Sequence, residues 1–192
     1  AQTTKFFTGI FASDSWFDDT KWAPTGKPSP LDTAIVNSGP PFRLGTIDAN
    51  PLPATALALI IGDLGRGRID QIGGTLDVGL LALGTGTSGL GELNITGGET
   101  LADRGIAGGA GGASLVLAGS GKLTTERMIL GNGAAGTFEK QVTQAGFASN
   151  TVSGQLELGL LGPATYLHTG GLNKVMDLYV TGPTHVGVDG FV

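Results

Sequence analysis

The sequence predicts an all-β fold: a single-stranded β-solenoid (β-helix) of about six coils, with 22–28 residues per coil and an irregular N-terminal cap. Three observations predict it. A short apolar strand that ends in glycine recurs along the chain, a second glycine corner recurs at its own offset, and no stretch has a sustained helical period. We therefore expect almost no α-helix, above all beyond residue 57.

The strand that ends in glycine is the first marker of the repeat. It appears as LIIG, LALG, MILG and LELG, with weaker copies at 106–108 and 178–182. The closing glycines, numbered 62, 84, 108, 131, 159 and 182, are spaced by 22, 24, 23, 28 and 23 residues. One coil should therefore carry an insertion.

The second marker is a glycine corner that follows each of these strands. The last glycines of these corners, numbered 74, 98, 121, 146 and 171, are spaced by 24, 23, 25 and 25 residues. Short alternating strands lie between the two markers, too short to form a sheet alone. Their hydrogen-bond partners must be the equivalent strands one coil away, at a spacing of about 4.8 Å.

Composition divides the chain into three parts, because most prolines and aromatic residues precede residue 57 and most glycines follow it. We predict a regular Gly-rich solenoid over 58–192 and a Pro-rich irregular first coil over 31–57, with strand-like pieces at 33–36 and 42–47. Residues 1–30 form an aromatic N-terminal cap or assembly segment. Its apolar residues are Phe6, Phe7, Ile10, Phe11, Trp16, Phe17 and Trp22.

Charge and composition exclude several classes of partner. The chain has 16 acidic against 11 basic residues and no basic stripe, so we expect no nucleic acid partner. Its longest apolar run, 56–61, is far shorter than the roughly 18 residues of a membrane span. The absence of cysteine excludes disulfides and thiolate chemistry. The start at Ala1, without an initiator Met, favours removal of a signal peptide and export.

At this point a family resemblance can be stated. Residues 16–22, Pro28, the LDTAIV segment at 31–36 and units such as LGTGTSGLGELNITGG at 83–98 resemble secreted bacterial autotransporter-passenger-like proteins, that is, glycine-rich β-solenoid repeat proteins. The resemblance covers residues from about 16 to 182. It implies a solenoid architecture and an extracellular or cell-surface location, and no specific activity.

Motifs that bind nucleotides or metals in other proteins have structural explanations in this sequence. Residues 84–89 and 131–136 match G-x-G-x-x-G, but a strand rather than a helix N-terminus should follow each, and the motif recurs with the coil period. His168 and His185 are not spaced as metal ligands, and no coil supplies the aspartate of calcium-binding repeats. Asp14, Asp18 and Asp19 are attributed to capping or solvent exposure rather than to a cation site. We therefore predict no cofactor and no metal.

An enzymatic role would need charged residues gathered on one face of adjacent coils. The candidates are Asp63, Arg66, Arg68, Asp70, Asp77, Glu92, Asp103 and Arg104. Scattered solvating charges explain them equally well, so we predict that the chain is not an enzyme and name no catalytic residue. The threonines do not align at one coil position, which argues against an ice-binding face.

Assembly is the function that the sequence favours. A solenoid has an unpaired strand at each end, and residues 185–192 alternate like a strand. We therefore predict an extracellular structural protein that stacks head to tail, or donates a strand, into a homopolymeric filament or matrix. The joint would be formed by Phe6, Phe7, Ile10, Phe11, Val186, Val188, Phe191 and Val192. The alternatives are a surface adhesin that binds glycans and, less favoured, a polysaccharide-degrading solenoid enzyme.

Overall fold

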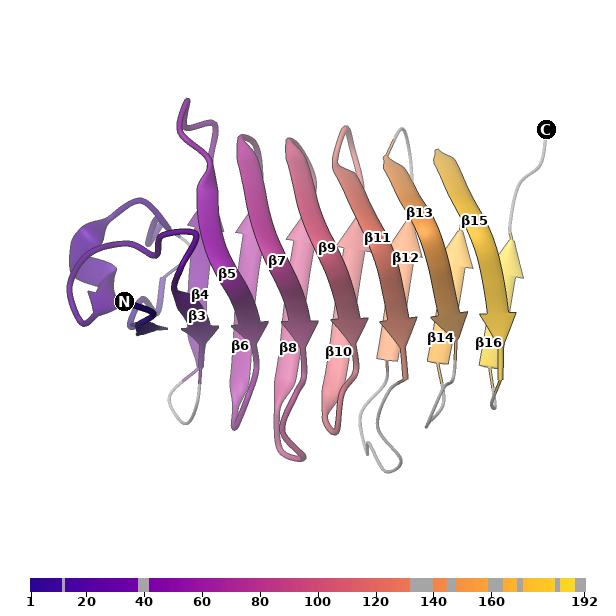
Figure 1. Cartoon of the computed structure of the whole chain (residues 1–192), viewed down its shortest axis with the longest axis horizontal. Helices are drawn as coiled ribbons and strands as arrows, with labels where there is room; N and C mark the ends of the chain where they lie inside the picture. Colours follow the sequence, from indigo (N-terminus) through magenta and orange to yellow (C-terminus); the bar gives the residue numbers. More distant parts are fainter. Residues whose placement is uncertain are drawn as a thin grey trace.

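The chain is a β-solenoid whose coils follow one another along the long axis of the molecule (Figure 1). A computed structural model describes residues 1–11, 13–37, 42–131, 140–144, 148–158, 164–168, 171–181 and 184–188. Within these ranges the only helix is a short 3-10 turn, η1 (Asp19–Lys21). The predicted all-β solenoid without α-helix is confirmed for the described residues.

Two sheets make the walls of the solenoid, and each coil contributes one strand to each sheet. Sheet A has nine strands in the order β15-β13-β11-β9-β7-β5-β3-β1-β2. Their bounds are β1 (Thr4–Phe7), β2 (Trp22–Ala23), β3 (Thr33–Val36), β5 (Ala54–Ile61), β7 (Thr75–Leu83), β9 (Glu99–Ala107), β11 (Lys122–Leu130), β13 (Ser149–Leu158) and β15 (Leu172–Val180).

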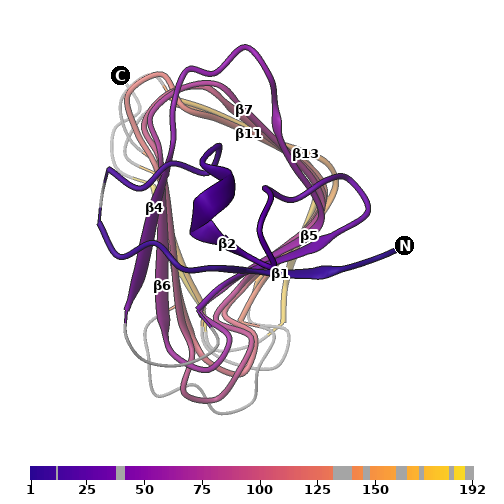
Figure 2. The same cartoon turned by 90° about the vertical axis from the view of Figure 1, so that its left-hand side faces the viewer.

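Sheet B has seven strands in the order β16-β14-β12-β10-β8-β6-β4. Their bounds are β4 (Arg43–Ile47), β6 (Arg66–Gln71), β8 (Leu90–Ile95), β10 (Gly112–Leu117), β12 (Lys140–Gln144), β14 (Ala164–His168) and β16 (Thr184–Val188). Strands β3 and β4 lie in the Pro-rich region and pair in parallel with β5 and β6, so this region forms the first coil. Figure 2 looks at the stack from its N-terminal end, with β4 and β6 on one side and the bent strands of sheet A on the other.

The in-register pairing builds continuous columns of side chains inside the solenoid. One such column in sheet A passes from Leu59 through Leu81, Gly105, Met128 and Leu156 to Leu178. Its members from Leu59 to Leu156 are buried. Because every inner strand pairs with a strand on each side, its backbone donors and acceptors are satisfied within the stack.

Glycines turn the chain at both predicted corners. After sheet A strands, Gly62, Gly84, Gly108 and Gly131 have φ between 63° and 73°, and before the next sheet A strand Gly74, Gly98, Gly119 and Gly171 have φ between 58° and 83°. The predicted insertion lies between Leu130 and Lys140, where residues 132–139 fall outside the described part. Strand β13 adds a register shift opposite Thr125 and Arg127.

Sheet A also has a feature that the alternating pattern did not predict. In β5, β7, β9 and β11, two consecutive residues that are not buried interrupt the alternation, and a buried residue follows each pair. These pairs are 57–58, 79–80, 103–104 and 126–127, and they stack in register. Sheet A therefore bends along one line, which we call the bend line, and charged residues project from it in the middle of the molecule.

Candidate assembly interface

The C-terminal end of the described stack has a free strand edge. Among the described residues, strand β15 is the terminal strand of sheet A, and its one partner strand is β13, with eight aligned residues from Leu172 to Val180. Figure 1 shows β15 and β16 together at the end of the stack opposite the N-terminus. On the side away from β13, no described strand pairs with the stretch from Asn173 to Val180, and backbone N–H and C=O groups on such a strand edge can pair with another chain.

The core of the solenoid is open at the same end. Leu178 and Val180 occupy the inward columns of Leu156 and Leu158, which are only 2% and 1% exposed in the preceding coil. In β15 the same positions are 55% and 54% exposed. The difference arises because no described coil covers β15 on its outer side. Other exposed apolar residues of this strand are Leu172, Met176 and Tyr179.

The N-terminal end is covered in both sheets. In sheet A, β1 pairs in parallel with β3, and β2 then pairs with β1 in the antiparallel direction, Phe7 opposite Trp22. In sheet B, residues 9–11 and 13–16 run along the edge of β4 that faces away from β6. The Leu44 amide donates to the Gly9 carbonyl (3.3 Å), the Thr46 amide to the Asp14 carbonyl (2.9 Å) and the Trp16 amide to the Thr46 carbonyl (2.9 Å).

Three aromatic side chains fill the covered end. Trp16, Trp22 and Phe7 are at most 2% exposed. Their rings meet edge to face, with centroids 5.0 Å apart for Phe7 and Trp22 and 4.8 Å apart for the two tryptophans. The Trp22 indole N–H donates to the Trp16 carbonyl at 2.9 Å. Such rings bury large apolar areas, so they close the column as a cap would.

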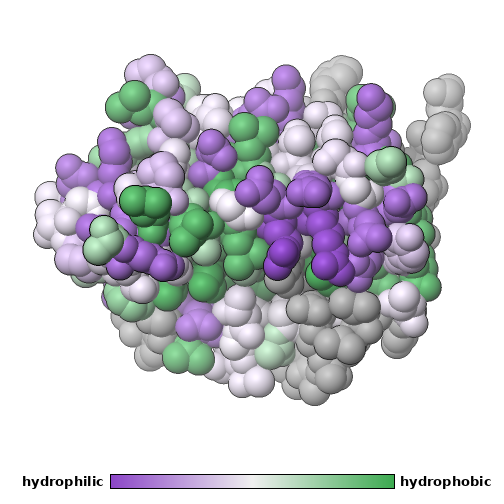
Figure 3. All heavy atoms as spheres, viewed as in Figure 1, coloured by the Kyte–Doolittle hydropathy of each residue, from purple (hydrophilic) through white to green (hydrophobic). Residues whose placement is uncertain are grey.

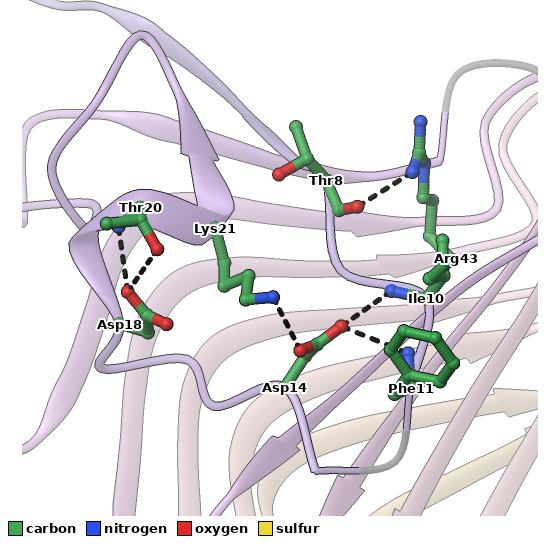
Figure 4. A network of polar contacts seen from close by, with 8 residues as sticks. All are labelled: Thr8, Ile10, Phe11, Asp14, Asp18, Thr20, Lys21 and Arg43. Atoms are coloured by element: carbon green, nitrogen blue, oxygen red, sulfur yellow. Dashed lines mark hydrogen bonds and ion pairs between the residues drawn. The ribbon is translucent and has the colours of Figure 1, made fainter.

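Polar contacts fasten this cap (Figure 4). The Asp14 carboxylate accepts hydrogen bonds from the amides of Ile10 (2.8 Å) and Phe11 (3.0 Å), and it forms an ion pair with the Lys21 ammonium at 2.7 Å. The hydrogen bond from Lys21, followed by those from the two amides, lowers the pKa of Asp14 despite its burial. The Arg43 guanidinium donates to the Thr8 carbonyl at 2.7 Å.

The predicted joint residues have different positions. Phe6, Ile10 and Phe11 are exposed on the cap, whereas Phe7 packs in the cap interior beside Trp22. Val186 and Val188 belong to β16, and nothing is described of their side chains. Phe191 and Val192 lie outside the described residues.

Sequence reasoning missed the apolar side chains of β15 as candidates for the joint. The signal was present, because 178–182 is the last copy of the strand-and-glycine marker. Leu178 and Val180 occupy the same repeat positions as the inward residues of earlier copies, so the repeat alone could have selected them as inward-facing residues.

The charged residues weighed for catalysis are divided between two sheets. On sheet B, Arg66 pairs with Glu92 (2.8 Å), and Asp70 accepts from both Arg68 and Asn94 (2.8 Å each). Asp77, Asp103 and Arg104 belong to sheet A, and Asp63, in the turn after β5, accepts from the Thr85 hydroxyl (2.8 Å).

Hydrophilic residues gather on the outer face of sheet A over β9, β11 and β13 (Figure 3). The ion pair of Arg127 with Glu157 joins β11 to β13 there. A hollow of about 320 Å³ opens on this face beside the bend line. It is lined by Gly79, Leu80, Asp103, Arg104, Glu126 and Arg127.

The remaining motifs were also located. The first G-x-G-x-x-G segment joins β7 to β8, so a strand follows it as predicted, and the second lies outside the described residues beyond Gly131. His168 and His185 lie on the paired strands β14 and β16. Asp18 accepts from the Thr20 amide and hydroxyl, and Asp19 from the Lys27 amide.

The described residues contain no group of three or more His, Cys, Asp or Glu side chains placed as metal ligands would be. They also contain no helix with the length and apolar character needed to cross a membrane.

Comparison with known proteins gave no match: no family model, no curated protein and no solved structure corresponds to this chain. The resemblance to autotransporter-passenger-like repeats therefore remains a prediction from the sequence.

Proposed function

We propose that this chain is an extracellular structural protein, a subunit that assembles end to end with its own copies into a filament or matrix. The observation that carries the proposal is the open end at β15, where a free strand edge and exposed core positions occur together. Backbone pairing and apolar burial both favour association there.

The exposed apolar residues of the two ends support a head-to-tail arrangement. The cap exposes Phe6, Ile10 and Phe11, and β15 exposes residues of similar size, among them Met176 and Leu178. Contact between two different surfaces of identical subunits is heterologous and propagates without closing, which produces filaments. Exposed apolar surface at both ends is typical of interaction sites rather than of a monomer surface.

Negative-stain microscopy and sedimentation of the purified chain test this proposal. Wild type should form fibres, and Leu178→Lys should remain monomeric, because a charge would enter the stacked core column. Ile72→Lys is the matched control, since Ile72 is 59% exposed but lies far from β15 in the strand order. A wild-type chain that stays monomeric at high concentration would overturn the proposal, as would fibres of Leu178→Lys equal to those of wild type.

A glycan-binding surface protein is the second candidate. The observation that favours it is the pair of neighbouring hollows on sheet A, whose lining includes Asp103 and Glu126 together with the hydroxyl residues Thr124 and Ser153. Carboxylates and hydroxyls are suitable hydrogen-bonding partners for sugar hydroxyls. A glycan array on wild type and on Glu126→Ala tests it. Loss of a bound glycan in the variant is expected, and an empty array for wild type would exclude it.

A further inference from the structure

The two ends of the solenoid differ in a way that affects stacking. The edge of β15 is open, but the matching edges at the N-terminal end are covered by the segment between β1 and the first coil. We call residues 8–11 and 13–23 the plug; they contain η1, β2, Trp16 and Trp22. The exposed cap residues can contact β15 with the plug in place, but continuous strand pairing from one copy to the next requires the plug to move aside.

The strands beneath the plug already have the direction that stacking needs. Strand β1 pairs in parallel with β3, Thr4 opposite Thr33 and Phe6 opposite Ile35, so it continues the ladder of sheet A in the same sense as every later strand. Strand β4 likewise runs parallel to β6. Only β2, which pairs antiparallel with β1 over two residues, interrupts this order.

We propose that the plug covers a docking surface formed by the edges of β1 and β4, and that this surface accepts β15 and β16 of a second copy once the plug moves aside. The inference rests on the proposed function and specifies its interface. If the register of sheet A continues across the joint, Tyr179 of one copy aligns with Phe6 of the next, and Val180 aligns with Phe7. The plug is then an internal inhibitor of assembly.

Docking would replace the contacts of the plug with similar contacts from the second copy, as in strand or domain swapping. Release exposes the ends of the core columns that Trp16 and Trp22 cover, and the incoming coil covers them with Leu178 and Val180, which are exposed before docking. The plug also contains a buried polar group that lowers its stability. The Trp16 indole N–H has no hydrogen-bond partner among the described atoms, although the residue is fully buried. A buried unpaired donor weakens the hold of the plug.

The ion pair of Asp14 with Lys21 holds the plug in its folded shape. Both residues lie within it, and Asp14 fixes the loop at Ile10 and Phe11 while Lys21 fixes the turn that leads into β2. Removing the ion pair should loosen the plug and thereby weaken its backbone hydrogen bonds to β4, while the pairs of β1 with β3 and of β4 with β6, which do not involve Lys21, stay in place.

A disulfide lock tests the inference in the full chain, which has no cysteine of its own. Ser15 of the plug lies opposite Thr46 of β4 as a parallel partner. Adjacent strands are about 4.8 Å apart, within the range of Cα separations that a disulfide spans. In the double variant Ser15→Cys, Thr46→Cys, we expect the oxidised form to assemble at least tenfold more slowly than the same protein after reduction.

A second variant covers the case in which the cysteines themselves impair assembly. Lys21→Met should assemble severalfold faster than wild type, and Lys122→Met, an exposed cation in the middle of the stack, should assemble at the wild-type rate. Equal rates of the oxidised and reduced forms would overturn the inference and leave the proposed function standing. If neither the oxidised nor the reduced double variant assembles, a Lys21→Met variant that assembles at the wild-type rate overturns the inference. A wild-type chain that never assembles refutes the proposed function itself.

Discussion

At the scale of single residues, glycine decides where the coil can turn. At Gly84 φ is +63°, and an added Cβ would lie 1.9 Å from the Gly112 carbonyl oxygen of the next coil. Both the backbone conformation and the close approach of neighbouring coils therefore require glycine. The spacing of such glycines was visible in the sequence, and this is why the register of the coils could be predicted.

Gly84→Ala should lower the free energy of unfolding by at least about 2 kcal/mol, because strain at positive φ adds to a clash with a neighbouring backbone. Gly105→Ala is the matched control. Gly105 is also buried, but it has no positive φ, and its Cβ would meet the Met128 Cγ at an ordinary 3.5 Å. Urea unfolding measures both, and equal costs would contradict this role of the corner glycines.

One buried residue lowers the stability of the stack. The Thr125 hydroxyl has no hydrogen-bond partner among the described atoms, and it lies in an inward column between Ala102 and Val152. Thr125→Val keeps the shape and removes the unpaired group, so it should raise the free energy of unfolding by about 1 kcal/mol. Thr124→Val, on the outer face of the same strand, should change it by less than about 0.5 kcal/mol. Destabilisation by Thr125→Val would show that the hydroxyl has a partner in solution.

At the scale of elements, the repeated strands were predictable and the cap was only partly so. Alternating apolar residues and a glycine at a fixed offset identify strands such as β7 and β11, because each coil repeats the same local pattern. The parallel pairing of β1 with β3 has no such signature, since it depends on a contact across 29 residues. Burial of Phe7 beside the exposed Phe6 follows from that pairing.

The bend line was not predictable for a related reason. Two consecutive outward residues, such as Asp103 and Arg104, interrupt the alternation on which strand prediction depends. The sequence could place charged residues in neighbouring coils, but it could not distribute them between sheets A and B. The charged residues considered for catalysis therefore lie on two different sheets in the structure and do not form one patch.

The cap should be sensitive to acid. Lys21 and the amides of Phe11 and Ile10 lower the pKa of Asp14, and hydrogen bonds from Ser29 and the Thr3 amide lower that of Asp32. A carboxyl with a lowered folded pKa stabilises the fold fully above its ordinary value of 3.8, and this contribution is lost as the pH falls through the folded pKa. The charged groups that influence Asp14 are Lys21 and the neighbouring Asp18.

Tryptophan fluorescence can follow this transition, because the only two tryptophans of the chain, Trp16 and Trp22, are both in the cap. Emission should shift to the red below pH 3.8, while the circular dichroism of the coils changes less. Asp14→Asn should show part of the red shift already at neutral pH, and Asp103→Asn on the bend line should behave as wild type. An unshifted spectrum of Asp14→Asn would contradict the role of this carboxylate.

At the scale of the whole molecule, the stack is capped at one end and open at the other. Aromatic rings and the β4 edge contacts close the N-terminal end, whereas β15 has one partner strand among the described residues and exposes its core positions. The sequence predicted two ends that favour association, and the structure shows that they differ. This polarity is the physical basis of the proposed head-to-tail assembly and of its control by the plug.

Hydrogen exchange detected by mass spectrometry tests the central claim most directly. The backbone amides of residues 173–180 that point away from β13 should exchange at least tenfold more slowly in assembled protein than in dilute protein, because the β15 edge gains a partner strand. Amides of β9, already paired on both sides, should exchange equally in the two states. Exchange from β15 that is as fast in the assembly as in the monomer would contradict the account.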